Sequence, residues 1–236
     1  MNRIHLLNFV LLIFLSCQKD EERKIDASYH PDINPANFTS STSLTNPYFL
    51  APVGKTYRYE GQSEDGTEVV EEQRQATTKT VNGIECVVVK FTAWLNGQLS
   101  EEADDWYAQD NTGTVWYFGE YVNNYDDNGQ LADHEGSWEA GVDGAQPGII
   151  MPANPTVGLK YREEYYFNEA EDQAEIVNIG LMVSIPYGDF TNVLETRNWS
   201  ELEPDIVEQK FYAPGIGVIR EVSPSESEEL NLVSIQ

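Results

Sequence analysis

The sequence predicts an all-β domain of two related antiparallel halves, with few or no helices, that curl or close into a barrel-like or clam-like sheet. Three observations predict it: short segments alternate apolar and polar residues, Asx-Gly pairs stand between them, and three motifs recur at nearly one offset. Alternation with a period of two indicates strands with one buried face, and Asx-Gly favours tight hairpin turns. Closure would hide the edges that a large open sheet exposes.

Six segments carry the strand pattern through the domain, which we place at residues 48–236. They are rich in β-branched and aromatic residues: KTYRYEG (55–61), ECVVVKFTAW (85–94), TVWYFGEYV (114–122), GLMVSIPYG (180–188), FTNVLETRNW (190–199) and GVIREV (217–222). Hairpin turns are predicted at Asp65-Gly66, Asn82-Gly83, Asn96-Gly97 and Asn128-Gly129. The stretch NEAEDQAEIV (168–177) has a helix-forming composition, but its flanks favour a strand.

Motifs that recur in the same order indicate the two halves. PVGKTYRYE (52–60) resembles TVGLKYREE (156–164), with the shared glycines 104 residues apart (158 − 54). Trp94 aligns with Trp199, and Tyr107 in WYAQDNTGTVWYFGE aligns with Tyr212 in FYAPGIGVIREV, both 105 apart. We therefore expect half-repeats over about 48–122 and 155–236, joined by a Gly/Pro-rich link.

The most distinctive stretch, DWYAQDNTGTVWYFGE (105–120), is predicted to be mainly architecture. Its counterpart in the second half keeps the pattern of strand, Gly-containing turn and strand. The counterpart lacks both the acids around the turn and the tryptophans, so a catalytic centre is not what the two copies share.

The first residues have the order of an export signal: Arg3, an apolar run over 6–15, and Ser16 before Cys17. FLSC (14–17) resembles the lipobox of bacterial lipoproteins. The resemblance implies a signal peptide over 1–16 and acyl chains such as palmitate on Cys17, which anchor the protein in a lipid bilayer. QKDEE (18–22) resembles the surface-export tag of Bacteroidota lipoproteins and implies an outer-membrane position facing the cell exterior. Residues 17–47 would then be the lipidated Cys and a flexible tether.

Composition excludes several function classes. The chain has 40 Asp and Glu against 14 Lys and Arg, a net charge of −26, which repels phosphate backbones, so we expect no nucleic-acid partner. After the signal only His30 and His134 remain, too few for a zinc site or a Ser-His-Asp triad, and no Gly-rich phosphate loop is present. No cofactor is expected, and a calcium ion is the one candidate. Cys86 lies in an apolar run and is predicted to be a buried thiol.

The calcium candidate is NYDDNGQLADHE (124–135), which has the spacing of an EF-hand loop. Such loops bring several oxygens to a hard cation around a turn glycine, and here the ligands would be Asn124, Asp126, Asn128 and Glu135. Asn124 stands where the family has Asp, and the flanks resemble strands rather than helices. A hairpin with a solvated acidic arm is the alternative, and we favour it.

Acidic clusters leave a hydrolase as the rival class of function. Glycoside hydrolysis needs two carboxylates at a set separation, and Trp138 beside Glu139 is the best local pairing of aromatic ring and acid. Runs of acids are more often solvated faces, so this reading is not favoured. The link GSWEAGVDGAQPGIIMPANPTVG (136–158) could cover a cavity or only cross between the halves, and we favour the crossing.

Several segments together resemble a family of bacterial secreted proteins and lipoproteins with no established activity. They are NPYFLAPVGKTYRYEG (46–61), DWYAQD and VWYFGE within 105–120, GSWEAGVDGAQPGIIMPANPTVG (136–158), REEYYFNEAED (162–172) and FYAPGIGVIREV (211–222). The resemblance implies export and a β fold and transfers no catalytic residue.

The sequence favours a non-enzymatic cell-surface lipoprotein that binds a ligand or a partner. A small apolar molecule or a glycan could lie between the halves, with Trp106, Trp116 and Trp138 as contacts. The alternatives are a hydrolase acting on surface polysaccharide and a structural or adhesion module. An apolar closed interior would favour binding, two facing carboxylates in a cleft would favour the hydrolase, and the oligomeric state stays open.

Overall fold

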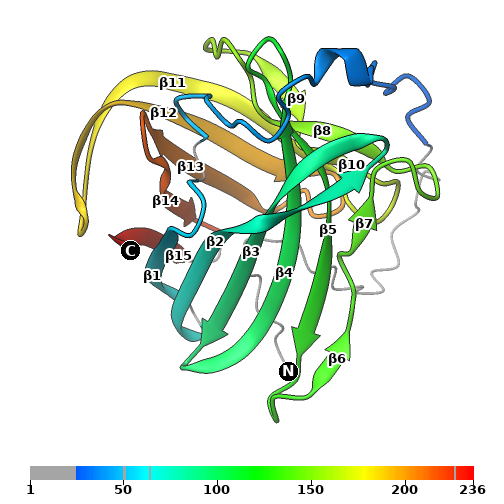
Figure 1. The fold of residues 1–236 in the computed structure, drawn as a ribbon. Coiled ribbons are helices and arrows are strands. Elements are labelled where there is room, and N and C mark those ends of the chain that lie inside the picture. The colour runs from blue at the N-terminus through cyan, green and yellow to red at the C-terminus, as the bar shows by residue number, and fades with distance from the viewer. Residues whose placement is uncertain (1–24, 50–51, 64, 226) are drawn as a thin grey trace.

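The computed structural model describes residues 25–49, 52–63, 65–225 and 227–236 (Figure 1). The expected signal peptide, Cys17 and the segment 18–22 lie outside the described residues. Strands dominate, and one short 3-10 helix, η1 (Pro35–Asn37), precedes them. In the described ranges no helix is long and apolar enough to cross a membrane.

Within the residues that the structure describes, fifteen strands form one sheet in which every pairing is antiparallel. The first half forms β1 (Thr56–Ser63), β2 (Gly66–Val81), β3 (Ile84–Leu95), β4 (Gln98–Gln109) and β5 (Val115–Tyr125). The link forms β6 (Leu131–Asp133), β7 (Trp138–Glu139) and β8 (Gln146–Met151). The second half forms β9 (Lys160–Arg162), β10 (Glu164–Tyr165), β11 (Asp172–Ile185), β12 (Gly188–Ser200), β13 (Val207–Ala213), β14 (Gly217–Ser223) and β15 (Glu228–Ile235).

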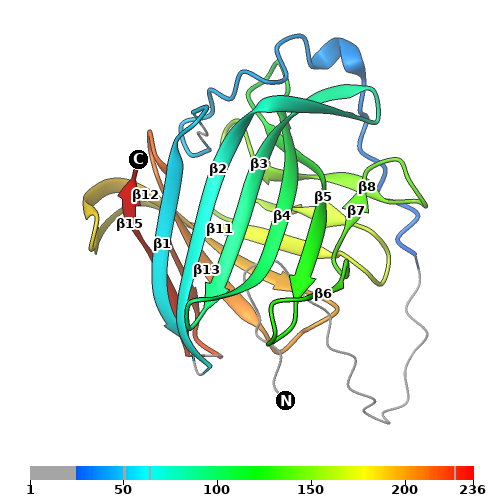
Figure 2. The same ribbon diagram turned by 60° about the horizontal axis from the view of Figure 1, so that its bottom comes forward.

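The sheet is nearly closed, because the two ends of its strand path are consecutive in the chain. The path runs β10-β8-β5-β4-β3-β2-β1-β15-β14-β13-β12-β11-β9. β9 pairs with β11 and β10 pairs with β8, and only Glu163 separates β9 from β10. In Figure 2, β1 to β5 form the front wall and β11 and β13 lie behind them. The all-β, barrel-like fold predicted from the sequence is confirmed.

The first and last strands of the domain are neighbours. β1 pairs with β15 from Tyr57↔Ile235 onward, and the backbones of Thr56 and Gln236 exchange hydrogen bonds of 3.1 and 3.0 Å. In Figure 1 the C-terminus therefore lies beside β1. This pairing joins the two halves of the sequence into one continuous wall.

Two of the predicted Asx-Gly turns have the backbone that this pair favours. Asn82 and Gly83 between β2 and β3 have φ of 47° and 79°, and Asn96 and Gly97 between β3 and β4 have φ of 52° and 80°. Positive φ at both central residues defines the tight turn whose twist matches that of a hairpin. The sequence thus predicts both hairpins and their lengths.

Residues aligned between the half-repeats lie on corresponding strands. Trp94 on β3 corresponds to Trp199 on β12, and Tyr107 on β4 to Tyr212 on β13. The stretch 168–177 enters β11 at Asp172, after a turn in which Tyr166 and Ala170 form an isolated bridge. A common origin of the two halves stays a prediction.

The N-terminal arm, residues 25–49, is packed against the sheet, which differs from the flexible tether expected over 17–47. Gln109 explains much of this, because its side-chain oxygen accepts the backbone N–H groups of Thr45 and Asn46 at 2.7 and 2.9 Å. The amide of Asn46 donates in turn to backbone oxygens of Gly113 and Pro152, both at 3.0 Å. The polar composition that suggested a tether instead supplies hydrogen bonds to the domain.

Candidate functional site

A partly open cavity lies inside the sheet and has a volume of about 140 Å³. Since one buried water needs roughly 10–15 Å³ on this measure, the cavity has room for on the order of ten waters or one small molecule. Its walls come from the strands of both halves, from Phe49 of the arm and from the segment around Glu163. The cavity is therefore built by the closure of the sheet.

Strand parity decides which side chains enter the cavity. On β4, Asp105 and Tyr107 line the cavity, whereas Trp106 between them points to the other face. On β5 a bulge is present, because Asp105 pairs with Glu120 and Tyr107 pairs with Tyr117, leaving two residues of β5 opposite Trp106. The bulge lets both Tyr117 and Glu120 reach the cavity.

Gly119 makes that bulge possible. Its φ is 125°, a region that L side chains rarely adopt, and a Cβ there would clash with the backbone oxygen of Trp138 on β7. The close approach of β7 and the inward turn of Glu120 thus depend on one glycine.

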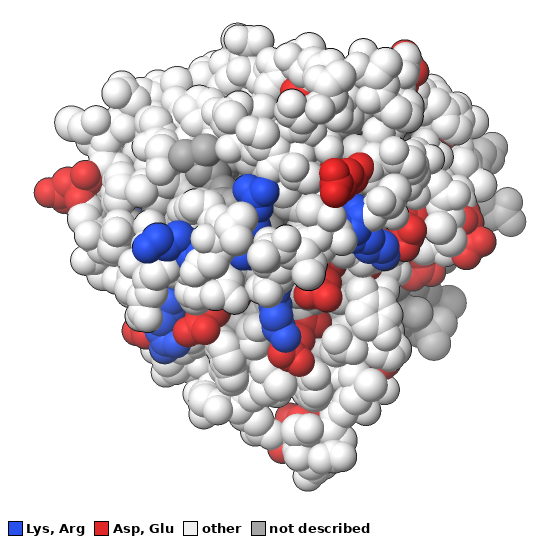
Figure 3. All heavy atoms as spheres, in the orientation of Figure 1, with Lys and Arg blue, Asp and Glu red and all other residues white. Residues whose placement is uncertain are grey.

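Acidic groups dominate the polar lining. Eight acids and three basic residues line the cavity: Glu72, Asp105, Glu120, Glu163, Glu164, Glu169, Asp172 and Glu221, with Lys55, Arg74 and Lys210. On the outer face in Figure 3, by contrast, acidic and basic side chains are interspersed. Part of the large excess of acidic residues therefore lies inside the molecule rather than on its surface.

Burial and mutual repulsion favour the neutral form of several of these acids over an unusual pH range. Burial, together with the charges of nearby acids, raises the pKa of Glu72 and of Asp105 to about 8 and that of Glu164 to about 7. The same causes raise the pKa of Glu120 and of Asp172 well above the ordinary range. Several interior carboxyls therefore bind protons near neutral pH.

Lys210 on β13 is the cation at the centre of this group. Burial disfavours its ammonium, but the negative charges of Glu221, Glu163 and Glu208 outweigh burial and raise the pKa of Lys210 well above its usual value. Among the other two basic residues, Lys55 is exposed, and Arg74 donates to the backbone oxygen of Thr42 in the arm at 2.6 Å. Lys210 thus faces an excess of acids.

The closing segment, residues 160–165 of β9 and β10, places two acids side by side. The carboxylate of Glu163 accepts from Asn198 on β12 at 2.7 Å, and that of Glu164 accepts from the indole N–H of Trp138 at 3.0 Å. A Cβ on Gly148 of β8 would clash with the backbone of Glu163, so β8 approaches this segment more closely than a side chain allows. Glu163 and Glu164 are held where the two edges of the sheet meet.

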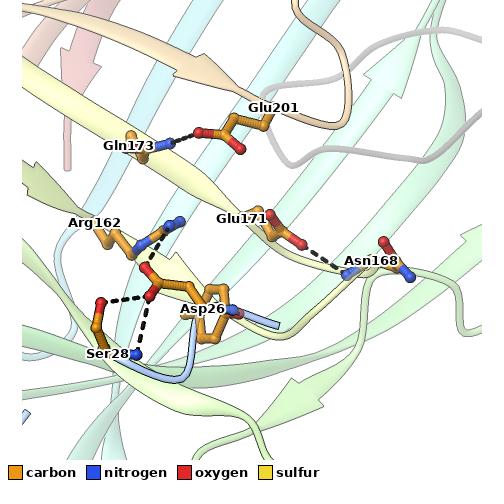
Figure 4. A network of polar contacts seen from close by, with 8 residues as sticks. Asp26, Ser28, Arg162, Asn168, Glu171, Gln173 and Glu201 are labelled. Atoms are coloured by element: carbon orange, nitrogen blue, oxygen red, sulfur yellow. Dashed lines mark hydrogen bonds and ion pairs between the residues drawn. The ribbon is translucent and has the colours of Figure 1, made fainter. Parts of the chain in front are cut away.

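The N-terminal arm contacts the closing segment from the outer side of the sheet (Figure 4). Asp26 lies 3.3 Å from Arg162 of β9, and its backbone N–H donates to the hydroxyl of Tyr165 on β10. Tyr29 donates to the backbone oxygen of Pro147 on β8 at 2.9 Å. Figure 4 also shows Glu171 accepting from the backbone of Asn168, just before β11. The arm thus joins β8, β9 and β10 across the closure.

A second set of buried acids lies further along the same inward faces. This set comprises Glu68 on β2, Glu101 on β4 and Glu228 on β15. Each acid is two residues from an apolar residue that packs inside, namely Val70, Ala103 and Leu230. Burial and neighbouring acids raise the pKa of Glu68. The interior therefore alternates acidic and apolar layers along these strands.

The tryptophans expected to contact a ligand lie outside the cavity lining. Trp106 and Trp138 are buried in an apolar cluster and border a separate hollow, where the ammonium of Lys79 lies 3.2 Å from the ring centre of Trp106. Trp116 is half-buried and donates to Asp110 at 3.0 Å. Tyrosines line the cavity instead: Tyr57, Tyr59, Tyr107, Tyr117 and Tyr212.

The calcium candidate forms the exposed hairpin between β5 and β6. Asp126 accepts the backbone N–H groups of Asn128 and Gln130, both at 2.9 Å, and the amide of Asn124 donates to Asp133 at 2.8 Å and to the backbone oxygen of Glu135 at 3.0 Å. Within the described ranges no three His, Cys, Asp or Glu residues are grouped so that they could hold a metal ion. Calcium binding there stays a prediction.

Sequence reasoning missed the interior acids. The alternation on β2 places Glu68, Val70 and Glu72 on one face, but an acid beside apolar residues is normally taken to mark the solvent side. One signal was available. On strands that are expected to close into a barrel, these acids stand two residues from apolar residues such as Val70 and Ala103, and so share a face with them.

Comparison with known proteins gives likeness in fold only. No family model and no curated protein matches the chain. A protein described as exported, with a YmcC-like fold, from Bacteroides fragilis has 14% identity and a TM-score of 0.45, covering 80% of this chain and 98% of that one. A protein described as a lipoprotein from Parabacteroides distasonis has 11% identity and a TM-score of 0.42, covering 81% and 99%. Likeness at this level assigns neither a function nor a site.

Proposed function

We propose that this chain is a non-enzymatic, lipid-anchored protein of the outer cell surface that binds a small polar ligand inside its sheet. The observation that carries the proposal is the cavity inside the sheet, whose walls combine several acidic groups with apolar and tyrosine side chains. Small-molecule sites are concave and largely preformed, with a few polar groups that fix the ligand. A structural or adhesion module has no need of such an interior.

Cys17 and the segment 18–22 support the anchor and the surface position. The order of apolar run, Ser16 and Cys17 is that of a lipoprotein signal, and the acids after Lys19 match the export tag. Acyl chains on Cys17 would hold the protein to the bilayer. The arm that begins at Ile25 would then carry the domain close to the membrane.

Native mass spectrometry of the mature protein, purified in detergent with its lipid, tests the proposal. We expect acyl chains on Cys17 and a substoichiometric or stoichiometric adduct of small-molecule mass on the folded domain. The same spectra recorded with added calcium test the hairpin ligands, since a specific calcium adduct should disappear in Asp126→Ala. A domain that carries no adduct after incubation with cell extract metabolites contradicts the binding role.

One observation favours the hydrolase as a second candidate. Asp105 and Glu120 are direct cross-strand partners on β4 and β5, so their side chains start roughly 5 Å apart. Retaining glycosidases use carboxyls about 5 Å apart, one of them with a raised pKa as the general acid. Product release from surface polysaccharide that is lost in Asp105→Asn would establish this candidate; binding without turnover supports the first.

A further inference from the structure

We propose that the ligand of the interior cavity is a small organic cation, a protonated amine or diamine, which contacts the carboxylates around Glu120 and Glu163. This inference deepens the binding function proposed above and rests on it. The sequence had pointed to an apolar molecule or a glycan, and the lining found in the structure is the reason for the change.

The balance of charge in the cavity selects a cation. Eight acids face three basic residues, and of these three only Lys210 lies deep in the cavity, since Lys55 is exposed and Arg74 is bonded to the arm. An anionic ligand would meet net repulsion, whereas an ammonium group favours the ionised form of each acid that it contacts and gains from the resulting carboxylate in a poorly solvated site.

Unused acceptors point to a ligand that donates hydrogen bonds. Glu163 and Glu120 are 4% and 6% exposed, yet Oε1 of Glu163 and Oε2 of Glu120 have no hydrogen-bond partner among the described residues. The same holds for Oδ1 of Asp172 and Oε2 of Glu221, which also line the cavity. A buried oxygen without a donor is costly, and an ammonium group brings three donors and no acceptor.

Tyrosine rings supply the remaining contacts. Tyr107 and Tyr117 stack at 4.8 Å between ring centres, and the hydroxyl of Tyr117 donates to Asp105 at 3.2 Å. Tyr59 donates to the backbone oxygen of Val218 at 3.1 Å. Because these hydroxyls already donate hydrogen bonds, the ring faces remain to contact the methylene chain of an amine and its ammonium group.

Size and geometry limit the choice of cation. A cavity of about 140 Å³ fits a ligand with on the order of ten non-hydrogen atoms. Within the described ranges the acids are not grouped to coordinate a metal ion, whereas an amine needs only one or two carboxylates at each end. A short aliphatic diamine such as putrescine meets both limits.

Isothermal titration calorimetry of the mature protein in detergent tests the inference. We expect putrescine to bind with a stoichiometry of one, and butanediol, which has the same chain length and no charge, to give no heat. Glu120→Gln and Glu163→Gln should each weaken putrescine binding by roughly tenfold or more, because each removes one acid that the ammonium group would hold in its ionised form. Asp104→Asn, next to Asp105 but on the outer face, should leave affinity within about twofold.

The outcomes distinguish a failure of the cation inference from a failure of the proposed binding function. If butanediol or a neutral saccharide binds as tightly as putrescine, or if both Gln variants bind putrescine like the wild type, the cation inference is wrong. A co-purifying neutral adduct in native mass spectra would then leave the binding function standing. Absence of heat with putrescine together with a bare mass in those spectra would overturn both. Thermal unfolding of each Gln variant confirms that it is folded.

Discussion

Lys210 is the residue on which the interior electrostatics depend most. It stands among Glu163, Glu208 and Glu221, and removing one partner of a buried charge group usually costs about 3–5 kcal/mol. We expect Lys210→Met to lower the free energy of unfolding by about that amount at pH 8, measured by urea denaturation. At pH 5, below the pKa of about 8 to which burial raises Glu208, the loss should be smaller.

Lys55→Met is the control for that measurement, since Lys55 is exposed at the rim of the cavity. It should change the free energy of unfolding by less than about 0.5 kcal/mol at either pH. An equal loss at pH 5 and pH 8 in Lys210→Met would show that Lys210 acts through packing and not through its charge.

Asp105 should behave in the opposite way. Burial raises its pKa to about 8, so above that pH the folded state contains an unfavourable buried charge, which Asn does not carry. When unfolded, Asp105 ionises near pH 4, so its penalty grows between about pH 4 and 8; Asp105→Asn should therefore match the wild type at pH 4 and be more stable by at least about 1 kcal/mol at pH 9. Differential scanning calorimetry at the two pH values measures this.

At the scale of elements, the closing segment between β9 and β10 depends on Gly148 of β8. A Cβ at position 148 would meet backbone atoms of Glu163 and Glu164, which cannot move without separating β8 from β10. Gly148→Ala should cost about 1–3 kcal/mol and increase hydrogen exchange in β8, β9 and β10. Exchange in β2 to β4 should stay slow.

Gly188 offers the matched control, because its φ is ordinary and a Cβ there meets open space at the start of β12. Gly188→Ala should leave both stability and exchange unchanged. If Gly148→Ala raised exchange uniformly over all strands, the closing segment would not be a separate unit.

The whole molecule should lose stability as pH rises. Glu72, Asp105 and Glu164 have pKa values of about 8, 8 and 7 in the folded state and ordinary values near 4 when unfolded. Between about pH 4 and 8 the folded state thus binds more protons, and the free energy of unfolding falls as pH rises through that window. We expect the Tm at pH 5 to exceed that at pH 8 by about 5 °C or more. A flat profile would show that cavity water or a bound cation already compensates the acids.

How far the sequence could predict the molecule differs between fold and site. Asn82-Gly83 and Asn96-Gly97 fix hairpins locally, and such signals need no knowledge of the rest of the chain. The direction of a side chain in a strand depends on its neighbours' register instead. Trp106 was expected to reach a ligand, but Asp105 and Tyr107 occupy the inward positions on either side of it. The bulge at Gly119 that brings Glu120 inward is equally a property of the assembled sheet.

The pairing of β1 with β15 has a consequence for when the protein can fold. Tyr57 meets Ile235, so the wall of the sheet lacks this central contact until β15 has been made. Contacts between distant residues form late and slowly, since the chain between them must first be ordered. A chain without β15 thus cannot complete the sheet. For a protein proposed to reach the outer cell surface, this order of strands delays completion of the fold until β15 is available.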